Sequence, residues 1–328
     1  MKQPSVSLLA GHRVLVAGDM FLDEYWIGRA VRLSREAPVP VLERTHSFAL
    51  PGGACNPAHN LSALGSQAVM LGVVGDDAAG RQLLALLEHA GVATDGVISD
   101  SSRPTTTKTR LVAESVLRVP QHVARMDAIA REPLDAATEQ ALLARLDALA
   151  PACAALLLSH YRGGVVTAAL AARVRMLATR HNAIAVADAQ ADLPRFRGFD
   201  LVKCNRAEAE AEIGMALVHD NDFERALHQL AAQLDVGCLA ITRGAEGMSL
   251  RTAAGSVLHS PAVSAGEIYD VVGAGDTVVA VLTLALLAGL PLATAAAWAN
   301  AAAGLAVRKL GNAVITPEQL QDALTHGS

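Results

Sequence analysis

Short, strongly apolar segments alternate with longer stretches of helical periodicity along most of this chain, and no other feature limits the possible folds as strongly. The first apolar segments occupy residues 13–17 and 69–74, and similar ones follow at 156–159, 184–188, 201–202 and 239–242. Helical patterns separate the later segments at about 135–149, 167–181 and 222–234. Strands that alternate with helices form right-handed βαβ units. The sequence therefore predicts one mostly parallel sheet covered by helices.

Three segments interrupt this alternation. Residues 37–44 contain prolines on both sides of Val39, which exclude a helix and favour an extended edge strand. Residues 105–112 alternate in polarity and are rich in β-branched side chains, and residues 118–127 have the pattern of a partner strand. We therefore predict a small β lid, with segments at about 20–47 and 103–127, inserted in a single domain that spans residues 1–328.

The composition argues against several classes of protein. The net charge is −5, from 27 basic and 32 acidic residues, whereas a general nucleic-acid binder has a basic surface. None of the four cysteines are spaced as metal ligands, and the first ten residues lack the pattern of a signal peptide, so we expect a cytoplasmic protein. Residues 277–307 carry no charge and are long enough to span a membrane, but a Gly289-Leu290-Pro291 turn divides them. We predict two buried helices there and no membrane contact.

A glycine-rich turn, Gly273-Ala274-Gly275-Asp276, precedes an apolar helical run. Unpaired backbone N–H groups at a helix N-terminus, here from the first three of these residues, form a site for an anion. If they hold a phosphoryl group, the carboxylate of Asp276 is placed to take a proton from an attacking hydroxyl. The alternative is an ordinary turn in which Asp276 only starts the helix.

Polar or small residues also follow earlier strands, at the sheet edge where α/β proteins bind ligands. Asp19 and Asp23 can hold the hydroxyl groups of a sugar, or they can serve as turn and capping residues. Gly52 and Gly53 allow close approach by a ligand, or they form a simple turn before a helix.

Two later strand ends carry the remaining parts of a phosphoryl-transfer site. Asn205 and Glu208 can hold a hydrated Mg²⁺ ion, or they can form a helix-capping pair. Thr242, Gly244 and Gly247 offer a hydroxyl and accessible backbone for a nucleotide. The chain has no Walker phosphate loop and no G-x-G-x-x-G after its first strand, so neither a Walker-type enzyme nor a dinucleotide dehydrogenase is indicated.

Two motifs resemble the signatures of the ribokinase-like, or phosphofructokinase-B-type, sugar kinases. They are Gly52-Gly53-Ala54-Cys55-Asn56 and the D-x-x-G-A-G-D-T sequence from Asp270 to Thr277. The resemblance extends over nearly the whole chain. It is strongest to the bacterial D-glycero-D-manno-heptose-7-phosphate 1-kinases, because residues 18–26 and 34–41 are similar to the G-D-x-M-L-D-x-Y-W and S-P-E-A-P-V-P-V segments of that group.

This resemblance implies a three-layer α/β/α sandwich with a mostly parallel central sheet and a small β lid, which often forms a homodimer interface. It implies ATP and Mg²⁺, a monovalent cation such as K⁺ near Asp270, and Asp276 as the catalytic base. The implied substrate-binding residues are Asp19, Asp23, Gly52, Gly53, Asn56, Lys108 and Asp127. The implied nucleotide-binding residues are Asn205, Thr242, Arg243, Gly244, Gly247 and Asn300.

The chain departs from the heptose kinase pattern near the same sheet edge. Asp188-Ala189-Gln190 replaces D-P-K, Lys203-Cys204-Asn205 replaces T-P-N, and residues 159–164 replace S-D-Y-x-K-G with a histidine at position 160. Gln190 removes a cation that could meet a phosphate, and Lys203, Arg35 or Arg162 are the candidates to restore one. The nucleotidyltransferase half that is fused in some relatives is not expected within these 328 residues.

We therefore expect an ATP-dependent sugar kinase with the heptose 7-phosphate as its first candidate acceptor. A ribokinase-like kinase for a different sugar or a nucleoside is the alternative. A nucleotide-binding regulator without catalysis is a third possibility, but such a protein would have lost the base or the glycines, and Asp276, Gly273 and Gly275 are all present.

Overall fold

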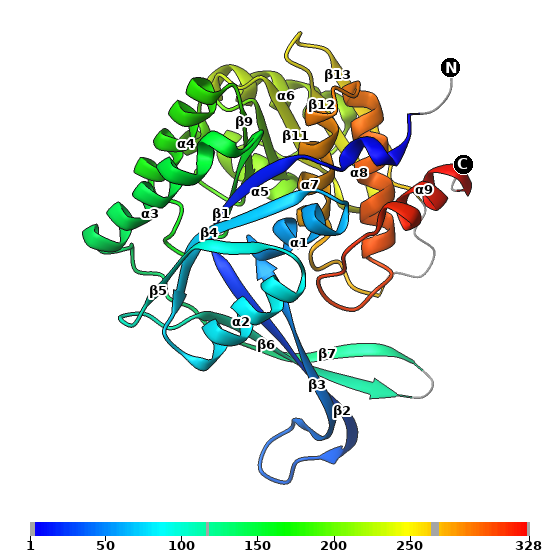
Figure 1. Cartoon of the computed structure of the whole chain (residues 1–328). Coiled ribbons are helices and arrows are strands. Elements are labelled where there is room, and N and C mark those ends of the chain that lie inside the picture. Colours follow the sequence, from blue (N-terminus) through cyan, green and yellow to red (C-terminus); the bar gives the residue numbers. More distant parts are fainter. Residues whose placement is uncertain (1–3, 116–117, 264–268, 327–328) are drawn as a thin grey trace.

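The computed structural model describes residues 4–115, 118–263 and 269–326, and most of these form an α/β body (Figure 1). The strands of the body are β1 (Arg13–Gly18), β4 (Gln67–Gly75), β5 (Ala93–Asp100), β8 (Ala155–His160), β9 (Ile184–Ala189), β10 (Leu201–Asn205), β11 (Cys238–Thr242), β12 (Met248–Arg251) and β13 (Val257–Ser260). Within the described residues they form one nine-stranded sheet in the order β13-β12-β11-β10-β9-β8-β1-β4-β5. All neighbours pair in parallel except β11 with β12 and β12 with β13.

The central strands are buried along almost their whole length, which is why they appear in the sequence as continuous apolar runs. Polar side chains are concentrated where these strands end. In register across the sheet, Ser159 of β8 lies beside Asp188 of β9, and Asp188 lies beside Lys203 of β10. The parallel arrangement therefore brings side chains from distant parts of the sequence to one edge.

Helices cover both faces of the sheet. They are α1 (Cys55–Ala63), α2 (Ala78–His89), α3 (Ala136–Leu149), α4 (Ala168–His181), α5 (Arg206–Ile213), α6 (Asp220–Leu234), α7 (Ala274–Leu287), α8 (Leu292–Ala306) and α9 (Pro317–His326). Helices α1, α2, α7, α8 and α9 share one apolar core with the sheet, and α3 to α6 share a second. Two cores on opposite faces confirm the predicted three-layer α/β/α sandwich.

The uncharged run at 277–307 forms parts of α7 and α8, which are the two buried helices that the sequence predicted, and the structure packs them on each other. Among the helices of the described residues, none has both the length and the apolar character required to cross a bilayer.

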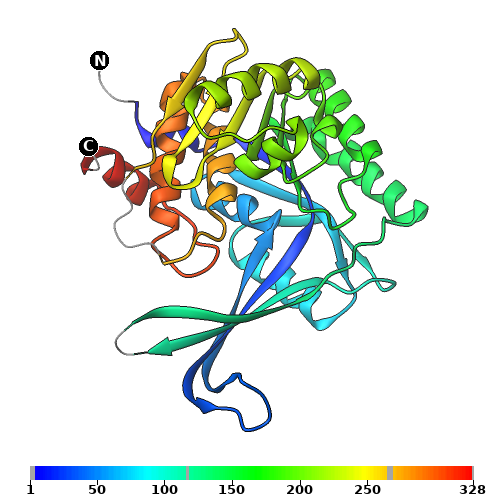
Figure 2. The ribbon, with the colours of Figure 1, turned by 180° about the vertical axis from the view of Figure 1, so that it is seen from behind.

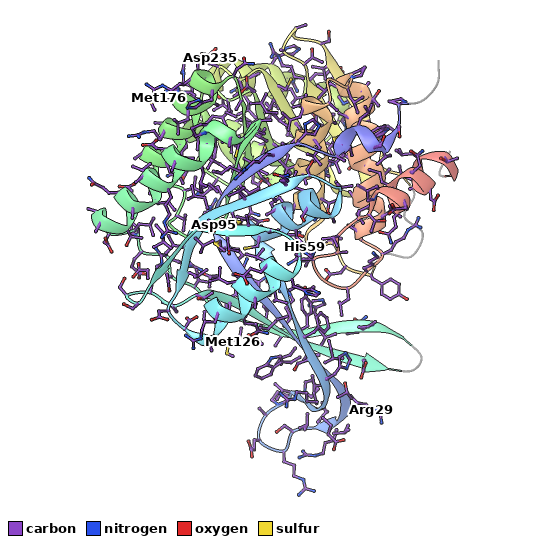
Figure 3. The ribbon with its side chains drawn as sticks, in the orientation of Figure 1. Arg29, His59, Asp95, Met126, Met176 and Asp235 are labelled. Carbon is purple, nitrogen blue, oxygen red and sulfur yellow. The ribbon has the colours of Figure 1, made fainter. Side chains whose placement is uncertain are left out.

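A second sheet projects from the body, and Figure 2 shows it from behind. It contains β2 (Met20–Leu33), β3 (Pro40–Gly53), β6 (Thr106–Ser115) and β7 (Arg118–Ala128) in the order β3-β2-β6-β7. We call these four strands the lid sheet. Arg29 lies on its β2–β3 hairpin, far from the body (Figure 3). The predicted lid segments at 20–47 and 103–127 contain most of these strands, although positions 116 and 117 fall outside the described residues.

Candidate active site

A cavity of about 1140 Å³ lies between the lid sheet and the edge where the parallel strands end. Its walls come from the lid sheet, from the ends of β10 and β11, from the loops after β8 and β9, and from the first turn of α7. This volume exceeds that of most single-ligand pockets, so two ligands can be held side by side.

Asp276 lies in the first turn of α7 and lines this cavity, although only 4% of its surface is exposed. The amide of Asn56 donates a hydrogen bond to its Oδ2 at 2.8 Å, and the hydroxyl of Tyr161 donates one to its Oδ1. Burial, reinforced by the nearby charge of Asp188, raises the pKa of Asp276 to about 7, and the two hydrogen bonds oppose this rise. A carboxylate with a pKa near neutrality is well suited to accept and release a proton.

The turn before Asp276 has the geometry of an anion site. Gly273 has φ +78°, and a Cβ at this position would lie 2.5 Å from the amide nitrogen of Asn56. Among the described residues, no acceptor is bonded to the N–H of Gly275 or Asp276, whereas the N–H of Ala274 donates to the carbonyl of Val271 at 3.4 Å. Of the three predicted donors, Gly275 is thus free and Ala274 is partly engaged.

A buried ion pair lies directly beside this turn. The amine of Lys203 is 2.8 Å from Oδ1 of Asp188, and it is also 2.8 Å from the place where a Cβ on Gly275 would be. Burial lowers the pKa of Lys203, but Asp188 and then Glu208 outweigh that effect and raise the pKa overall, so this amine stays charged. Among the described residues, Oδ2 of Asp188 is buried without a hydrogen-bond partner.

Of the three candidate replacement cations, Lys203 lines the cavity beside Gln190. Arg35 is exposed on the lid sheet hairpin, and Arg162 is exposed and donates to the carbonyl of Gln190 at 3.5 Å. Only the first of them therefore presents its charge to the α7 turn.

The predicted sugar-binding carboxylates have different surroundings. Asp19 is 1% exposed and does not contribute to the cavity wall, because its oxygens accept hydrogen bonds from the backbone N–H groups of Tyr161, Gly163 and Val165. Asp23 does line the cavity, but Arg110 and Asn312 donate to its two oxygens at 2.7 and 2.5 Å. Asp19 therefore organises a loop, and Asp23 belongs to a hydrogen-bonded cluster at the cavity wall.

The glycine pair is required by the protein itself. A Cβ on Gly52 would lie 2.1 Å from the carboxylate of Asp23, and one on Gly53 would lie 2.3 Å from the carbonyl of Asp19. The close approach predicted for a ligand is thus made by the protein's own oxygens, although Gly53 does line the cavity.

Lys108 reaches the cavity from the lid sheet. Its amine stands 3.9 Å from the centre of the Phe21 ring, and among the described residues no carboxylate lies within ion-pair distance of it. Burial lowers the pKa of Lys108, because the amine has lost part of its hydration. Asp127, its register partner, is instead bonded to Arg125 at 2.8 and 3.0 Å and lies outside the cavity.

Asn205 and Glu208 form a reciprocal capping box at the start of α5. The side chain of Asn205 accepts from the N–H of Glu208 at 2.9 Å, and Oε2 of Glu208 accepts from the N–H of Asn205 at 2.5 Å. Both residues also line the cavity. The cap leaves Oε1 of Glu208 available, which fits Mg²⁺, because this ion keeps most of its waters and needs few protein oxygens. Among the described residues there is no group of three or more histidine, cysteine or acidic side chains that could hold a metal ion by themselves.

The predicted nucleotide side of the cavity is built from the end of β11. Thr242, Gly244 and Gly247 all line it, and a Cβ on Gly247 would lie 2.2 Å from the carbonyl of Ser260. Arg243 also lines the cavity, and its guanidinium pairs with Asp220 at 2.6 Å and with Glu246 at 2.8 Å.

Two further predicted residues act as supports. The amide of Asn300 donates to the carbonyls of Ser260 and Pro261 at 2.9 Å each, so it holds a loop at the cavity wall. The carboxylate of Asp270 accepts from the N–H groups of Val272 and Gly311 at 3.0 Å each. Asp270 therefore fixes the loop before α7 and lies outside the cavity lining.

Comparison with known proteins decides the family. The model of the pfkB family carbohydrate kinases matches residues 12–319. This chain belongs to the pfkB family of carbohydrate kinases. It is therefore a phosphotransferase that acts on a carbohydrate alcohol group, as the sequence predicted.

The relatives of this pfkB-family kinase include longer proteins. It is 41% identical to the bifunctional protein HldE of Geobacter metallireducens over 325 residues, which are 98% of this chain and 65% of that protein. It is 38% identical to the bifunctional protein HldE of Geobacter sulfurreducens, over 99% of this chain and 66% of that protein. The chain thus spans about two thirds of the length of these relatives.

Solved structures share the fold of this pfkB-family kinase at low sequence identity. Escherichia coli phosphofructokinase-2, in complex with substrates and products, has a TM-score of 0.79 at 18% identity, covering 96% of this chain and 98% of its own. Arabidopsis thaliana ribokinase, complexed with ribose and ATP, has a TM-score of 0.73 at 17% identity, covering 96% and 99%. These similarities confirm the ribokinase-like fold.

Sequence reasoning missed Tyr161 and Asn312 as members of the site. Tyr161 appeared only within a motif that departs from the heptose kinase pattern, and its contact with Asp276 joins residues 115 positions apart. Asn312 donates to Asp23, a residue 289 positions away in the sequence. The signal available in the sequence was the place of Tyr161 within residues 159–164, which correspond to a segment of the heptose kinase pattern.

Proposed function

We propose that this kinase transfers the γ-phosphoryl group of ATP to a hydroxyl of a sugar phosphate, with O1 of D-glycero-D-manno-heptose 7-phosphate as the leading acceptor. The observation that carries the chemistry is Asp276, buried at the cavity wall beside the free N–H of Gly275 and the amine of Lys203. The heptose assignment draws its support from the resemblance of residues 18–26 and 34–41 and from the similarity to HldE proteins. Such a reaction would belong to ADP-heptose and lipopolysaccharide core synthesis.

In this proposal the reaction is a direct displacement. The acceptor hydroxyl gives its proton to the carboxylate of Asp276 as its oxygen bonds to the γ-phosphorus. The bond from that phosphorus to the β–γ bridging oxygen breaks, and ADP leaves. Negative charge on the transferred group faces the N–H of Gly275 and the amine of Lys203, which stabilise it without moving.

Two ions belong to the proposal. Mg²⁺, held by way of Glu208 and Asn205, would neutralise charge on the phosphates of ATP. A monovalent cation such as K⁺ would be held by the loop of Asp270, which lies directly before the α7 turn. ATP itself would lie along the end of β11, where Thr242 and Gly244 line the cavity.

Lys108 supports a phosphorylated acceptor over a neutral one. A partly dehydrated amine without a carboxylate partner is costly, and an anionic ligand removes that cost. Lys108 lines the cavity from the lid sheet, whereas the proposed nucleotide site is at the end of β11. The phosphate of a sugar phosphate is the ligand group that suits it.

ATP consumption against a panel of acceptors tests this function. We expect turnover with the heptose 7-phosphate, weaker turnover with other sugar phosphates, and little with free ribose or a nucleoside. Lys108→Met should raise KM for the sugar phosphate by about 10-fold or more and leave KM for ATP unchanged. Preferred turnover of a neutral sugar or nucleoside would favour the alternative kinase, and ATP binding without turnover on any acceptor would favour the regulator.

We also propose a cytoplasmic homodimer joined through the lid sheet. Its exposed apolar side chains include Leu33 and Met126, which are 70% and 69% exposed, and Trp26 at 41%. Sedimentation velocity tests this directly. The wild-type chain is expected to sediment as a dimer and a Met126→Glu variant as a monomer, and a monomeric wild-type chain would contradict the proposal.

A further inference from the structure

Tyr161, in the loop after β8, contacts the proposed base Asp276 but takes no part in the reaction proposed above. The hydroxyl of Tyr161 donates its hydrogen bond to Oδ1 of Asp276, while Asn56 donates to Oδ2. Burial, together with the negative charge of Asp276, raises the pKa of Tyr161 far above its usual value. The phenol therefore stays protonated, and in this contact it acts only as a donor.

The loop that positions Tyr161 is tightly fixed. Asp19 accepts the backbone N–H groups of Tyr161, Gly163 and Val165 at 2.7, 3.0 and 3.1 Å. A Cβ on Gly163 would lie 2.8 Å from the carboxyl carbon of Asp19, so this loop approaches the carboxylate as closely as glycine permits. Three hydrogen bonds to one buried carboxylate hold the backbone on both sides of Tyr161.

The ring of Tyr161 is fixed as well. It meets the ring of Phe21 edge-to-face at 5.2 Å, and the amine of Lys108 lies 5.5 Å from its centre. Both contacts come from the lid sheet and use the ring, so they survive when the hydroxyl alone is removed. A Tyr161→Phe substitution therefore tests the hydroxyl in isolation.

The charged groups around Asp276 oppose one another. Asp188 of β9 disfavours the ionised form, whereas Lys203 of β10 favours it. Helix α1 contributes no charge next to Asp276: Asn56 donates its amide hydrogen bond, and burial raises the pKa of the Cys55 thiol so that it stays neutral. Asp23 of the lid sheet adds negative charge near Tyr161. In this balance the two donated hydrogen bonds are the direct contacts that favour the carboxylate over the carboxylic acid.

We propose that Tyr161 is a positioning residue for the base, whose hydroxyl, held in place through Asp19, orients the carboxylate of Asp276 and favours its ionised form. This assigns Asp19 a role in organising the base rather than in holding the sugar. The kinetic part of the test rests on the proposed function, since it requires an acceptor that is turned over.

The decisive experiment is the pH profile of kcat/KM for wild type and Tyr161→Phe, with ATP saturating. When the Asp276 carboxylate loses one hydrogen bond, its pKa rises, and the acidic limb of the kcat/KM profile should move upward by about one pH unit. With a limb near pH 7 in the wild type, the variant is expected to be about five-fold slower at pH 7 and nearly normal at pH 9. Tyr25→Phe is the matched control, because it removes a buried hydroxyl without a hydrogen-bond partner among the described residues, and its profile should match the wild type.

Two outcomes would overturn the proposal. If the acidic limb of the kcat/KM profile stays at the same pH in Tyr161→Phe, the hydroxyl does not affect the ionisation of Asp276, and Tyr161 serves only in packing. This holds whether or not the rate falls equally at every pH. An unchanged limb with a lower KM for the acceptor would show that the hydroxyl merely occupies the acceptor's place. In the Asp276→Asn background, Tyr161→Phe should cause no further loss, because both changes act on the same group.

A second readout does not depend on turnover. Melting temperatures measured from pH 5 to 9 report the protonation of Asp276 in the folded protein, and Tyr161→Phe should move that transition upward by about one pH unit. If the wild type turns over no acceptor at all, the proposed function fails, and an upward shift of this transition still supports the role of Tyr161. A transition at the same pH in both proteins would refute it.

Discussion

Lys203→Met should be far more destabilising than an ordinary loss of a surface charge. The side chains of Lys203 and Asp188 are only 7% and 1% exposed, and their contact is 2.8 Å. Oδ2 of Asp188 already has no hydrogen-bond partner among the described residues, so the substitution leaves a buried carboxylate with neither oxygen paired. Removing one partner of a buried ion pair costs about 3–5 kcal/mol.

The measurement is the free energy of unfolding from urea denaturation at pH 7. Arg173→Met is the matched control, because Arg173 pairs with Asp147 at 2.5 Å while their side chains are 36% and 42% exposed. Exposed pairs contribute about 1 kcal/mol or less, so the control should stay within that range.

A double variant tests the cause of the loss. Adding Asp188→Asn to Lys203→Met replaces the unpaired buried charge with a neutral amide, and it should recover at least about 1 kcal/mol. The reasoning is refuted if Lys203→Met costs less than about 1 kcal/mol or if the double variant is no more stable than the single one. The single variant should also lose activity, since the cavity then lacks the amine beside Gly275.

Three further predictions concern the α7 turn. Asp276→Asn should lower kcat by about 10²-fold or more with little change in KM for ATP, because a general base acts in the transition state, and near-normal turnover would exclude Asp276 as the base. The folded-state pKa of Asp276, about 7, lies above its ordinary value of 3.8, so its contribution to stability is complete below about pH 4 and is lost as the pH rises to about 7. The melting temperature of wild type relative to Asp276→Asn should fall over that range, and a constant difference would contradict the raised pKa. Gly273→Ala should reduce stability and kcat, since φ is +78° and the added Cβ would lie 2.5 Å from Asn56. Gly289→Ala is the control for backbone strain alone, because Gly289 has φ +67° and no atom lies within 4 Å of the added Cβ. Equal losses of stability in the two variants would show that the contact with Asn56 is unimportant.

The fold was predictable because its main signal is local. Continuous apolar runs such as β8 and β9 indicate strands that are buried on both faces, and the helices between them force parallel pairing. The peripheral strands β12 and β13 were not predicted, since each is only four residues long and β13 is partly exposed along its whole length. Their antiparallel pairing at one end of the sheet depends on tertiary contacts rather than on a periodic pattern.

The site was only partly predictable, because the type of a residue at a strand end does not reveal which other group of the protein that residue contacts. Gly52 and Gly53 suggested room for a ligand, but the groups that require the missing Cβ atoms are Asp23 and the carbonyl of Asp19. Arg243 follows a strand at the nucleotide side, yet its guanidinium is drawn to Asp220 and stacks 4.1 Å from the Phe223 ring. In each case the deciding contact joins residues that are distant in sequence or lie on a different element.

Three aspartates at the same sheet edge show how surroundings separate chemical roles. Asp19 directly follows β1, Asp188 lies near the end of β9, and Asp276 lies in the first turn of α7, which packs against β8 and β9. Asp19 is occupied by three backbone N–H groups and Asp188 by a lysine, so neither lines the cavity. Asp276 alone of the three lines the cavity. It accepts side-chain hydrogen bonds from Asn56 and Tyr161, and burial together with the charge of Asp188 raises its pKa to about 7. The charge of Asp188 thus acts at a distance on the group that performs the chemistry, while Lys203 prevents that charge from suppressing ionisation altogether.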